Sequence, residues 1–212
     1  MKTVVSIARN VLKVLPGYPM LRRGYEALRT LGKTNEYWGR VVMNRETRKI
    51  VRGLKPNTLK TLEISGSSWG KWESFKEYKE VHHPDFDICG SSLEETFDLI
   101  IAEQVFEHLL WPYRAGRNVY RMLNPNGYLL ITTPFLIRIH DQPIDCSRWT
   151  EIGIKYFLAE CGFSLERIQT GSWGNRTCIR ANFTRWAPYR PLFHSLRNEP
   201  RFPMVVWAIA QK

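Results

Sequence analysis

The loop "RIHDQPIDCSRW", residues 138–149, carries the side chains best suited to proton transfer. A histidine has an unperturbed pKa of about 6.5, so His140 is largely neutral at pH 7 and can accept a proton. Asp141 or Asp145 is close enough in sequence to orient its ring. We therefore predict His140 as a general base that Asp145 orients. In the alternative interpretation, Asp145 pairs with Arg148 to hold the loop, and His140 is a solvated loop residue.

Three apolar runs upstream of this loop each end in polar residues. The stretch "TLEISGSSWG" (residues 61–70) has an acid near the end of its run, followed by Ser and Gly, whose small side chains let backbone N–H groups approach a ligand. Polar residues also follow "VHHPDF" and "FDLIIA". In an open parallel sheet, ligands bind outside the carboxyl ends of the strands. The candidate binding residues at this edge are Glu63, Ser65, Gly66, Ser67, Asp87, Glu103 and Gln104.

Hydrophobic patterns predict the elements that position these residues. Strand-like runs lie at 59–65, 81–83, 97–102, 128–133 and 204–210. One helix is predicted from Pro112, a good first-turn residue, to Leu123, and another from a capping Thr150 to Gly162. This alternation of strands and helices predicts an α/β fold, with a doubly wound and mostly parallel sheet covered on both faces.

The net charge of +11 lies in the first 60 residues, which contain 14 Lys or Arg and 3 acids, whereas residues 61–212 contain 17 of each. Apolar residues over 4–15 recur at helical spacing opposite basic residues, which predicts an amphipathic helix. This helix caps the core, lies on an anionic membrane surface or faces nucleic acid; all three interpretations are open. We predict a basic helical segment over 1–55, acting as a lid or docking surface, and the main domain over 56–212.

Composition excludes several classes of protein. A chain of 212 residues, 43% of them hydrophobic, is long enough for one domain with a full core. No apolar run approaches the roughly 18 to 20 residues that span a bilayer, and the N-terminus is a poor signal peptide. A cytoplasmic protein is therefore predicted, with the inner membrane surface as a peripheral contact. The four cysteines lack CxxC spacing, which predicts reduced thiols, and no metal site is expected.

The central part of the chain resembles a known family. The resemblance is carried by "FDLIIAEQVFEHL", "LNPNGYLLITTPF" and a later "RWT…GF", in order within residues 97–163. Together they are similar to the central and C-terminal half of class I S-adenosylmethionine-dependent methyltransferases, of the group that acts on small molecules and glycans. The resemblance covers residues 61–163, about half of the chain. It implies a Rossmann-like sheet of seven strands, the last one antiparallel, and S-adenosylmethionine as cofactor.

The resemblance implies roles for the residues around the first loop. Glu63 matches the acid that contacts the methionine portion of the cofactor directly or through the loop. Ser65, Gly66 and Ser67 take the place of the family's glycine-rich loop. Serine is nearly as small as glycine, but at a position that requires a positive φ it would be strained by about 1 kcal/mol or more.

Other matching residues are expected around the adenosine part of the cofactor. Asp87, followed by Ile88, resembles the acid that accepts a hydrogen bond from the adenine amino group. Glu103 with Gln104 matches the segment that lines the cofactor after the next strand. The family's acid for the ribose hydroxyls is replaced by His82, and a neutral histidine offers only one acceptor atom.

These features predict a methyltransferase that transfers a methyl group to oxygen of a small molecule or glycan, bound under the loops at 134–150 and 171–193. The basic N-terminus suggests an RNA methyltransferase or binder instead, although "AEQVFEH" differs from the Asn-Pro-Pro-Tyr type sequence of enzymes that methylate amino groups of nucleic acids. The serine loop and His82 suggest a third alternative, a non-catalytic module that keeps the fold. The sequence predicts neither the acceptor's identity nor the oligomeric state.

Overall fold

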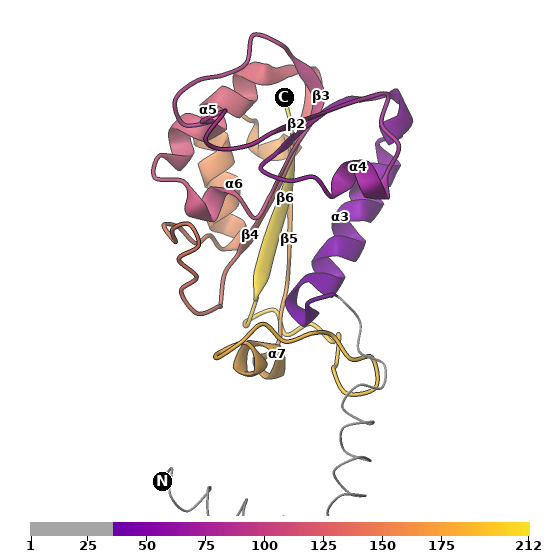
Figure 1. The fold of residues 1–212 in the computed structure, drawn as a ribbon, viewed down its shortest axis with the longest axis vertical. Helices are drawn as coiled ribbons and strands as arrows, with labels where there is room; N and C mark the ends of the chain where they lie inside the picture. The colour runs from indigo at the N-terminus through magenta and orange to yellow at the C-terminus, as the bar shows by residue number, and fades with distance from the viewer. Residues whose placement is uncertain (1–35) are drawn as a thin grey trace, which may run out of the picture.

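The computed structural model describes residues 36–212, so the amphipathic helix predicted at residues 4–15 lies outside the described residues. The described chain forms a six-stranded sheet in the order β2-β1-β3-β4-β6-β5 (Figure 1). The strands are β1 (Lys60–Ile64), β2 (Glu77–Val81), β3 (Phe97–Glu103), β4 (Leu123–Pro134), β5 (Ile168–Trp173) and β6 (Val205–Gln211). The first four strands are parallel, and β6 is antiparallel to β4 and β5. The predicted α/β class with an antiparallel last strand is confirmed.

The seventh strand that the resemblance implies has no counterpart in residues 36–212. Strand β2 is the edge of the sheet, and only residues 82–96 separate it from β3. A parallel crossover takes at least about 10 to 12 residues. This segment therefore has room for a single connection but not for a further strand with a connection on each side, and the expected count of seven is corrected to six.

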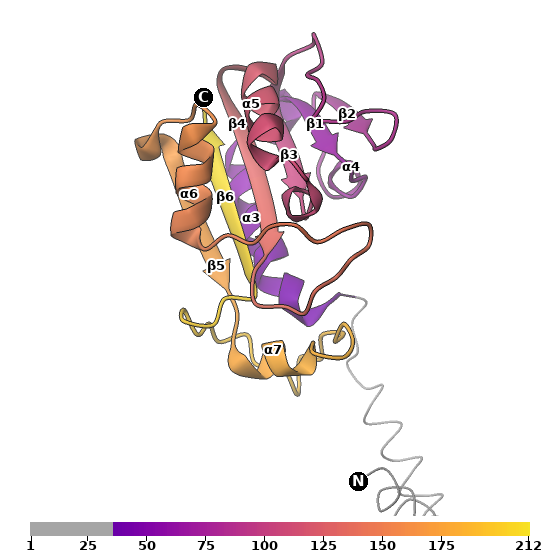
Figure 2. The same cartoon turned by 90° about the vertical axis from the view of Figure 1, so that its left-hand side faces the viewer.

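Helices cover both faces of the sheet. Helices α3 (Val41–Gly53) and α4 (Trp69–Trp72) lie on one face, and α5 (Pro112–Met122) and α6 (Glu151–Glu160) lie on the other (Figure 1 and Figure 2). Helix α7 (Arg176–Ala181) and the loop after β4 lie beyond the ends of the strands (Figure 2). The 3-10 turns are Trp38–Arg40, Pro56–Thr58, Phe106–His108 and Leu165–Arg167. Within residues 36–212, no helix combines the length and apolar character needed to cross a membrane.

Strand β3 shows how side-chain alternation builds a core on each side of the sheet. Leu99 and Ile101 pack with Val51 and Trp69 on the α3 side. Ile100 and Ala102 belong to the larger core beneath α5 and α6. A strand buried on both faces is the expected centre of a parallel sheet. Burial fixes this strand, and its carboxyl end lies at the edge where ligands are expected.

Helices α5 and α6 follow the predicted boundaries closely. Helix α6 begins after Thr150, whose hydroxyl accepts the Gly153 N–H at 3.0 Å, and the chain turns at Gly162 with φ of 121°. Strand β5 and helix α7 have no counterpart in the prediction. Strand β5 is the other edge of the sheet, and its partly exposed "QTGS" run has no alternating apolar pattern.

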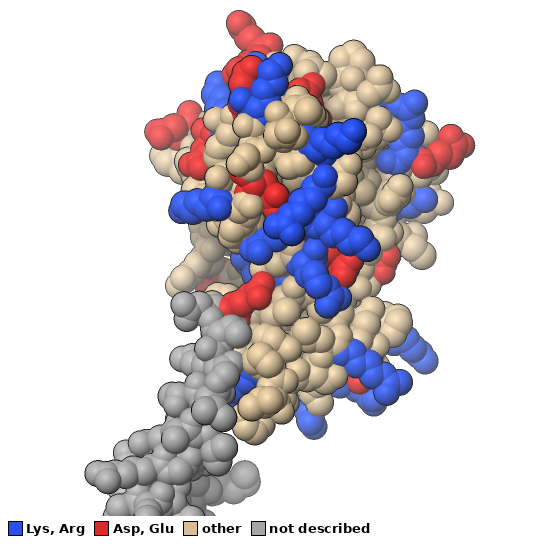
Figure 3. Space-filling model, turned by 90° about the vertical axis from the view of Figure 1, so that its right-hand side faces the viewer, with Lys and Arg blue, Asp and Glu red and all other residues tan. Residues whose placement is uncertain are grey.

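Helix α3 belongs to the same packed unit as the sheet, although it lies within the 1–55 segment predicted from charge. Its buried residues are Val42, Met43, Asn44, Thr47 and Val51. The opposite face exposes Arg45, Lys49 and Arg52, and Lys and Arg side chains gather over this helix in Figure 3. Part of the excess positive charge is therefore displayed on one face of the domain.

Candidate active site

A cavity of about 510 Å³ opens at the carboxyl ends of β1 and β3. We call it the β1–β3 cavity. Its walls include four of the predicted cofactor residues, Ser65, Asp87, Ile88 and Gln104, and the side chains of His83, Phe86, Val105, Leu109 and Trp111. This size, and a mostly apolar wall with a few polar groups, are typical of sites for small molecules and cofactors.

Glu63 holds the loop after β1 in place. Its buried carboxylate accepts the N–H groups of Ser68 at 3.2 Å and Trp69 at 3.0 Å, and also the hydroxyl of Tyr78. A Cβ at Gly66 would lie 2.0 Å from Glu63 Oε1, so only glycine leaves room for these contacts. Burial and the hydrogen bond to Glu63 raise the pKa of Tyr78. Glu63 thus acts through the loop, which is one of the two roles that the resemblance implies.

Two residues on the wall of the β1–β3 cavity have a left-handed backbone. Ser65 and Gln104 each have φ of 56°. The loop position at which strain is expected is therefore Ser65, whose N–H donates to Val81 at 2.7 Å. A non-glycine residue in this region costs about 1 to 2 kcal/mol, and such strain tends to occur at functional sites.

Asp87, Ile88 and Gln104 contribute different kinds of contact to the cavity. Asp87 is exposed, and its Oδ1 accepts the Cys89 N–H at 2.8 Å. Ile88 is buried and supplies an apolar wall. The side-chain amide of Gln104 donates to Thr132 Oγ1 at 3.1 Å, which fixes its orientation. A carboxylate beside an apolar wall is suited to an adenine ring with its amino group.

The end of β2 differs from the sequence prediction. His82, expected at the ribose position, is exposed, lies 3.6 Å from Glu80, and does not line the β1–β3 cavity. The next residue, His83, does line it. The strand ends at Val81, and the turn that follows points the second histidine, not the first, at the cavity. His82 therefore lies outside the cavity beside which its role was predicted, because the pair "HH" gives no indication of which ring points inward.

Glu103 supports the site from behind. Its Oε2 accepts the indole N–H of Trp69 at 3.0 Å, and its Oε1 lies 3.6 Å from Arg40. Burial raises the pKa of Glu103, although Arg40 opposes this effect. Like Glu63, Gly66 and Ser67, Glu103 lies beside the β1–β3 cavity and does not line it.

A second cavity, of about 300 Å³, lies next to the first. We call it the β4-loop cavity. Gln104 and His108 line both cavities. Its other walls come from the turn Phe106–His108, the turn before α3, the loop after β4 and the segment between α7 and β6. They include Tyr37, Arg40, Glu107, Ile137, His140, Gln142, Asn182 and Trp186. The last two segments are the loops predicted to cover the acceptor.

His140 lies in the wall of the β4-loop cavity. Its ring centroid is 4.9 Å from that of His108 and 5.9 Å from that of Trp186. Burial and the nearby His108 lower the pKa of His140, so its imidazole is neutral at pH 7. A neutral ring has the lone pair that a proton acceptor or a metal ligand requires.

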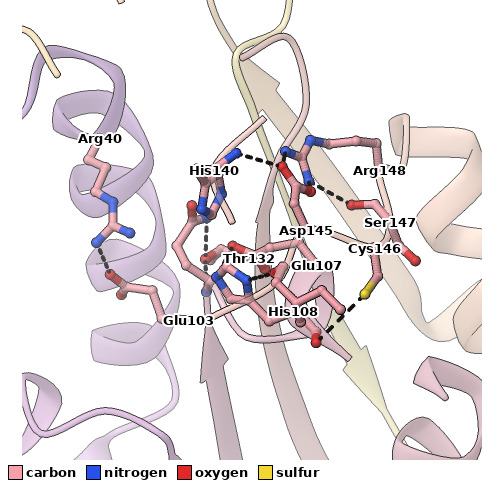
Figure 4. Close-up of polar contacts among 12 residues, drawn as sticks. Arg40, Glu103, Glu107, His108, Thr132, His140, Asp145, Cys146, Ser147 and Arg148 are labelled. Carbon is pink, nitrogen blue, oxygen red and sulfur yellow. Dashed lines mark hydrogen bonds and ion pairs between the residues drawn. The ribbon is translucent and has the colours of Figure 1, made fainter. Parts of the chain in front are cut away.

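Asp145 contacts the backbone of His140 and not its ring. Its Oδ2 accepts the His140 N–H at 2.9 Å, and both of its oxygens pair with the guanidinium of Arg148 (Figure 4). Burial opposes ionisation of Asp145, but Arg148 outweighs it and lowers the pKa of this carboxyl. These contacts correspond to the alternative in which Asp145 holds the loop. It positions His140 only through the main chain.

Glu107 is the residue that sequence reasoning missed. It is fully buried, and neither of its side-chain oxygens has a hydrogen-bond partner. Its Oε1 lies 3.8 Å from His108 Nε2, and burial raises its pKa to about 7. A buried, unpaired carboxyl with a perturbed pKa in a cavity marks a candidate functional site. The signal was present in the sequence, since a charged residue interrupts the apolar run "VFEHL".

The order of the elements and the cavity at the strand ends are matched by a known family. A family model described as a methyltransferase domain matches residues 28–160. The chain belongs to this family. The match extends through the end of α6 and includes the strands that carry the site of this methyltransferase. No curated protein matches its sequence significantly.

Solved structures support the same assignment at the level of the fold. An S-adenosylmethionine-dependent methyltransferase from Mesorhizobium loti is similar with a TM-score of 0.54 and 12% identity, over 77% of this chain and 96% of that chain. One from Archaeoglobus fulgidus has a TM-score of 0.53 and 15% identity, over 82% and 94%. Phosphoethanolamine N-methyltransferase 2 of Haemonchus contortus, in complex with S-adenosyl-L-methionine, has a TM-score of 0.51 and 11% identity. The similarity covers 80% of this chain and 52% of that chain.

The predicted family, and S-adenosylmethionine as its cofactor, are confirmed at the level of family and fold. The residues of this chain fit that cofactor in part. The β1–β3 cavity has a suitable volume and a carboxylate beside an apolar wall, whereas the Glu63 carboxylate is already engaged by the loop. Asp87 and Ile88 thus line a cavity of suitable size, and Glu63 contacts the loop beside it.

Proposed function

We propose that this methyltransferase transfers a methyl group from S-adenosylmethionine to an oxygen atom of a small molecule or glycan. The observation that carries the proposal is the junction of two cavities at Gln104 and His108. One cavity opens at the carboxyl ends of the strands, where an open parallel sheet binds its ligand, and the other contains a neutral imidazole. Aligning a methyl donor with an acceptor across such a junction can supply about 7 to 11 kcal/mol of catalysis in favourable cases.

The cofactor supplies an activated methyl group, so the chain has to bind, align and exclude water. In the β1–β3 cavity, the Asp87 carboxylate accepts the adenine amino group, and Ile88 and Phe86 pack against the ring system. Gln104 lies between the cavities with its amide fixed by Thr132. The family resemblance implies cofactor contacts at Asp87, Ile88 and Gln104, and the contact of Phe86 is inferred from its place in the cavity wall.

The β4-loop cavity suits an acceptor with a ring and several hydroxyl groups. Tyr37 and Trp186 contribute aromatic surfaces, with ring centroids 6.4 Å apart, on which a sugar ring can pack. Arg40 and Asn182 add hydrogen-bonding groups to the same walls. His140 accepts the proton that an acceptor hydroxyl loses as its oxygen takes the methyl group.

Calorimetric titration with S-adenosylmethionine and its demethylated product tests the cofactor site. We expect micromolar binding by the natural chain and at least about tenfold weaker binding by Asp87→Ala, because one charged hydrogen bond is lost. His82→Ala is the matched control, since His82 lies outside the cavity, and its affinity should be unchanged. Equal affinities for all three proteins would refute the assignment of Asp87. No binding at millimolar cofactor would favour a non-catalytic module.

Transfer of a labelled methyl group to candidate acceptors, beginning with sugars and lipid-linked glycans, tests the acceptor site. His140→Ala should lower kcat by roughly 10²- to 10⁴-fold and leave cofactor affinity unchanged. Label recovered in RNA, or salt-sensitive RNA binding in a gel shift, would favour the nucleic-acid alternative instead.

We further infer that the basic N-terminal segment docks the domain on an anionic membrane surface. The first 60 residues contain 14 basic and 3 acidic residues, and α3 exposes Arg45, Lys49 and Arg52 on one face (Figure 3). Clusters of this kind are attracted to anionic lipids. Such docking would bring the β4-loop cavity near lipid-linked acceptors.

A further inference from the structure

Three potential metal ligands meet at one end of the β4-loop cavity. Glu107, His108 and His140 all line it, and one ligand atom of each lies within 4.8 Å of the others. Figure 4 shows these side chains grouped together, with the Asp145–Arg148 pair beside them. We propose that Glu107, His108 and His140 bind a divalent transition-metal cation. The "EH" pair supplies two of these ligands, and the loop after β4 supplies the third.

The state of Glu107 is the first reason. Its carboxyl group is fully buried, and no hydrogen bond from the described chain reaches either oxygen. A buried carboxylate without a partner is costly, so such a group needs a proton or a cation. The guanidinium of Arg148 is nearby but is committed to Asp145, so it does not fill this role.

The hydrogen bond on the other side of His108 is the second reason. His108 Nδ1 contacts the carbonyl oxygen of Ile144, and because a carbonyl only accepts, Nδ1 carries the proton. In this tautomer Nε2 is the ring nitrogen available to a metal ion, and it lies 3.8 Å from Glu107 Oε1. The lone pairs of His108 Nε2 and Glu107 Oε1 repel one another, whereas a cation bound between these atoms would be coordinated by both. Histidine ligands typically donate their outer N–H to a backbone carbonyl in this way.

The third ligand is held by the same residues. The loop that carries His140 is tied to the Glu107 carbonyl oxygen through the N–H groups of Cys146 at 2.7 Å and Ser147 at 3.2 Å. A neutral imidazole has one nitrogen with a lone pair for a metal ion, and a ring nitrogen of His140 lies within 4.8 Å of the ligand atoms of Glu107 and His108. Metal–ligand distances of about 2.0 to 2.2 Å place the ligand atoms of a tetrahedral site about 3.4 Å apart. Ligand atoms that lie within 4.8 Å of one another must then move together by up to about 1.4 Å, which a movement of the loop that carries His140 can supply.

The ligand set indicates the kind of ion. Two imidazole nitrogens and one carboxylate oxygen suit Zn²⁺, Mn²⁺, Fe²⁺ or Co²⁺, whereas Mg²⁺ and Ca²⁺ prefer oxygen ligands alone. Three protein ligands leave coordination positions open toward the cavity.

One consequence concerns the acceptor, and it rests on the proposed function. A hydroxyl bound at an open position loses its proton to water more readily, because the cation stabilises the oxyanion. Acceptors with two neighbouring oxygens, such as vicinal diols, would fill two open positions. His140 then acts as a ligand in place of the proton acceptor assigned to it above. The cation is thus inferred to orient the acceptor oxygen toward the cofactor cavity.

Titration with Co²⁺ tests the site without requiring activity. The full chain, free of any tag and stripped with a chelator, should bind one equivalent of Co²⁺ with visible absorption bands, competed by Zn²⁺ and Mn²⁺. Glu107→Gln and His140→Ala should each weaken binding by at least about tenfold. Cys146→Ser, which removes a nearby exposed thiol, and His82→Ala, which removes a histidine outside the cluster, should bind as the natural chain does.

Three results would overturn the proposal: no stoichiometric binding of any of these ions, equal binding by all variants, or a preference for Mg²⁺ over Co²⁺ and Mn²⁺. Glu107→Gln should remain folded because it removes a buried charge that accepts no hydrogen bond from the described residues, and His140→Ala alters a partly exposed loop. Cofactor titration of the same samples separates the two proposals. Binding of Co²⁺ without binding of the cofactor would refute the proposed function but not the metal site. Binding of the cofactor without binding of Co²⁺ would refute the metal site alone.

Discussion

The loop after β1 gives a prediction at the scale of a single residue. Ser65 has φ of 56°, a conformation that glycine adopts without strain. We expect Ser65→Gly to raise the free energy of unfolding by about 0.5 to 1 kcal/mol, measured by urea titration. Ser67→Gly is the control, because Ser67 has no positive φ and should lose a similar amount through added chain entropy. Equal losses at both positions would contradict the strain assigned to Ser65.

The pKa of Glu103 gives a second prediction at this scale. Burial raises this pKa above its unfolded value of about 4.3, so folding favours the neutral carboxyl. The associated stability is present below about pH 4 and is lost as pH rises through the folded pKa. Glutamine mimics the neutral form and keeps an acceptor for Trp69. We therefore expect the stability of Glu103→Gln, relative to the natural chain, to increase from about pH 4 to about pH 7 in urea unfolding. If the free energies of unfolding of the two proteins changed in parallel with pH, the raised pKa of Glu103 would be contradicted.

Individual residues also show where sequence reasoning reaches its limit. The rule that ligands bind at strand ends correctly placed Ser65, Asp87 and Gln104 on one cavity. It could not choose between His82 and His83, because one turn of backbone decides which ring points inward. The importance of Glu107 depends on an unfilled hydrogen-bonding capacity in the folded core, and that becomes visible only when its neighbours are known.

At the scale of elements, local signals predicted what burial and capping determine. Helices α5 and α6, strand β4 and strand β6 follow their apolar patterns and caps. Edge strand β5 and the single turn of α4 do not, because few of their residues are constrained by the core. The count of strands failed for a different reason. It came from the family resemblance, whereas the length of the 82–96 connection is a property of this chain.

The start of α6 can be tested directly. The Thr150 hydroxyl accepts the Gly153 N–H at 3.0 Å and caps the helix that follows the His140 loop. Thr150→Ala should cost about 1 kcal/mol of unfolding free energy, because one helix N–H loses its partner. Thr150→Ser keeps the hydroxyl and should retain most of the stability. Thermal unfolding of the three proteins measures both effects, and equal losses would show that the cap contributes nothing.

At the scale of the whole molecule, the main feature is the uneven distribution of charge. Residues 61–212 contain equal numbers of basic and acidic residues, so the excess of +11 belongs to the first 60. Helix α3 displays part of this charge on the face of the sheet opposite α5 and α6 (Figure 1 and Figure 3). An excess confined to one segment of the chain, part of which one face displays, can orient the domain on a charged surface, whereas an even distribution would only increase solubility.

Vesicle co-sedimentation tests this orientation. The full chain should bind vesicles that contain phosphatidylserine and not neutral ones, and binding should weaken when residues 1–30 are removed or salt is raised. Arg45→Gln with Lys49→Gln should weaken binding by up to about 30-fold, since each cation near the surface contributes about 1 kcal/mol. Arg114→Gln with Arg117→Gln changes the net charge equally on α5, on the opposite face. If both pairs of substitutions weaken vesicle binding equally, net charge and not the α3 face determines binding. Equal binding with and without residues 1–30 would exclude docking through the helix predicted at residues 4–15.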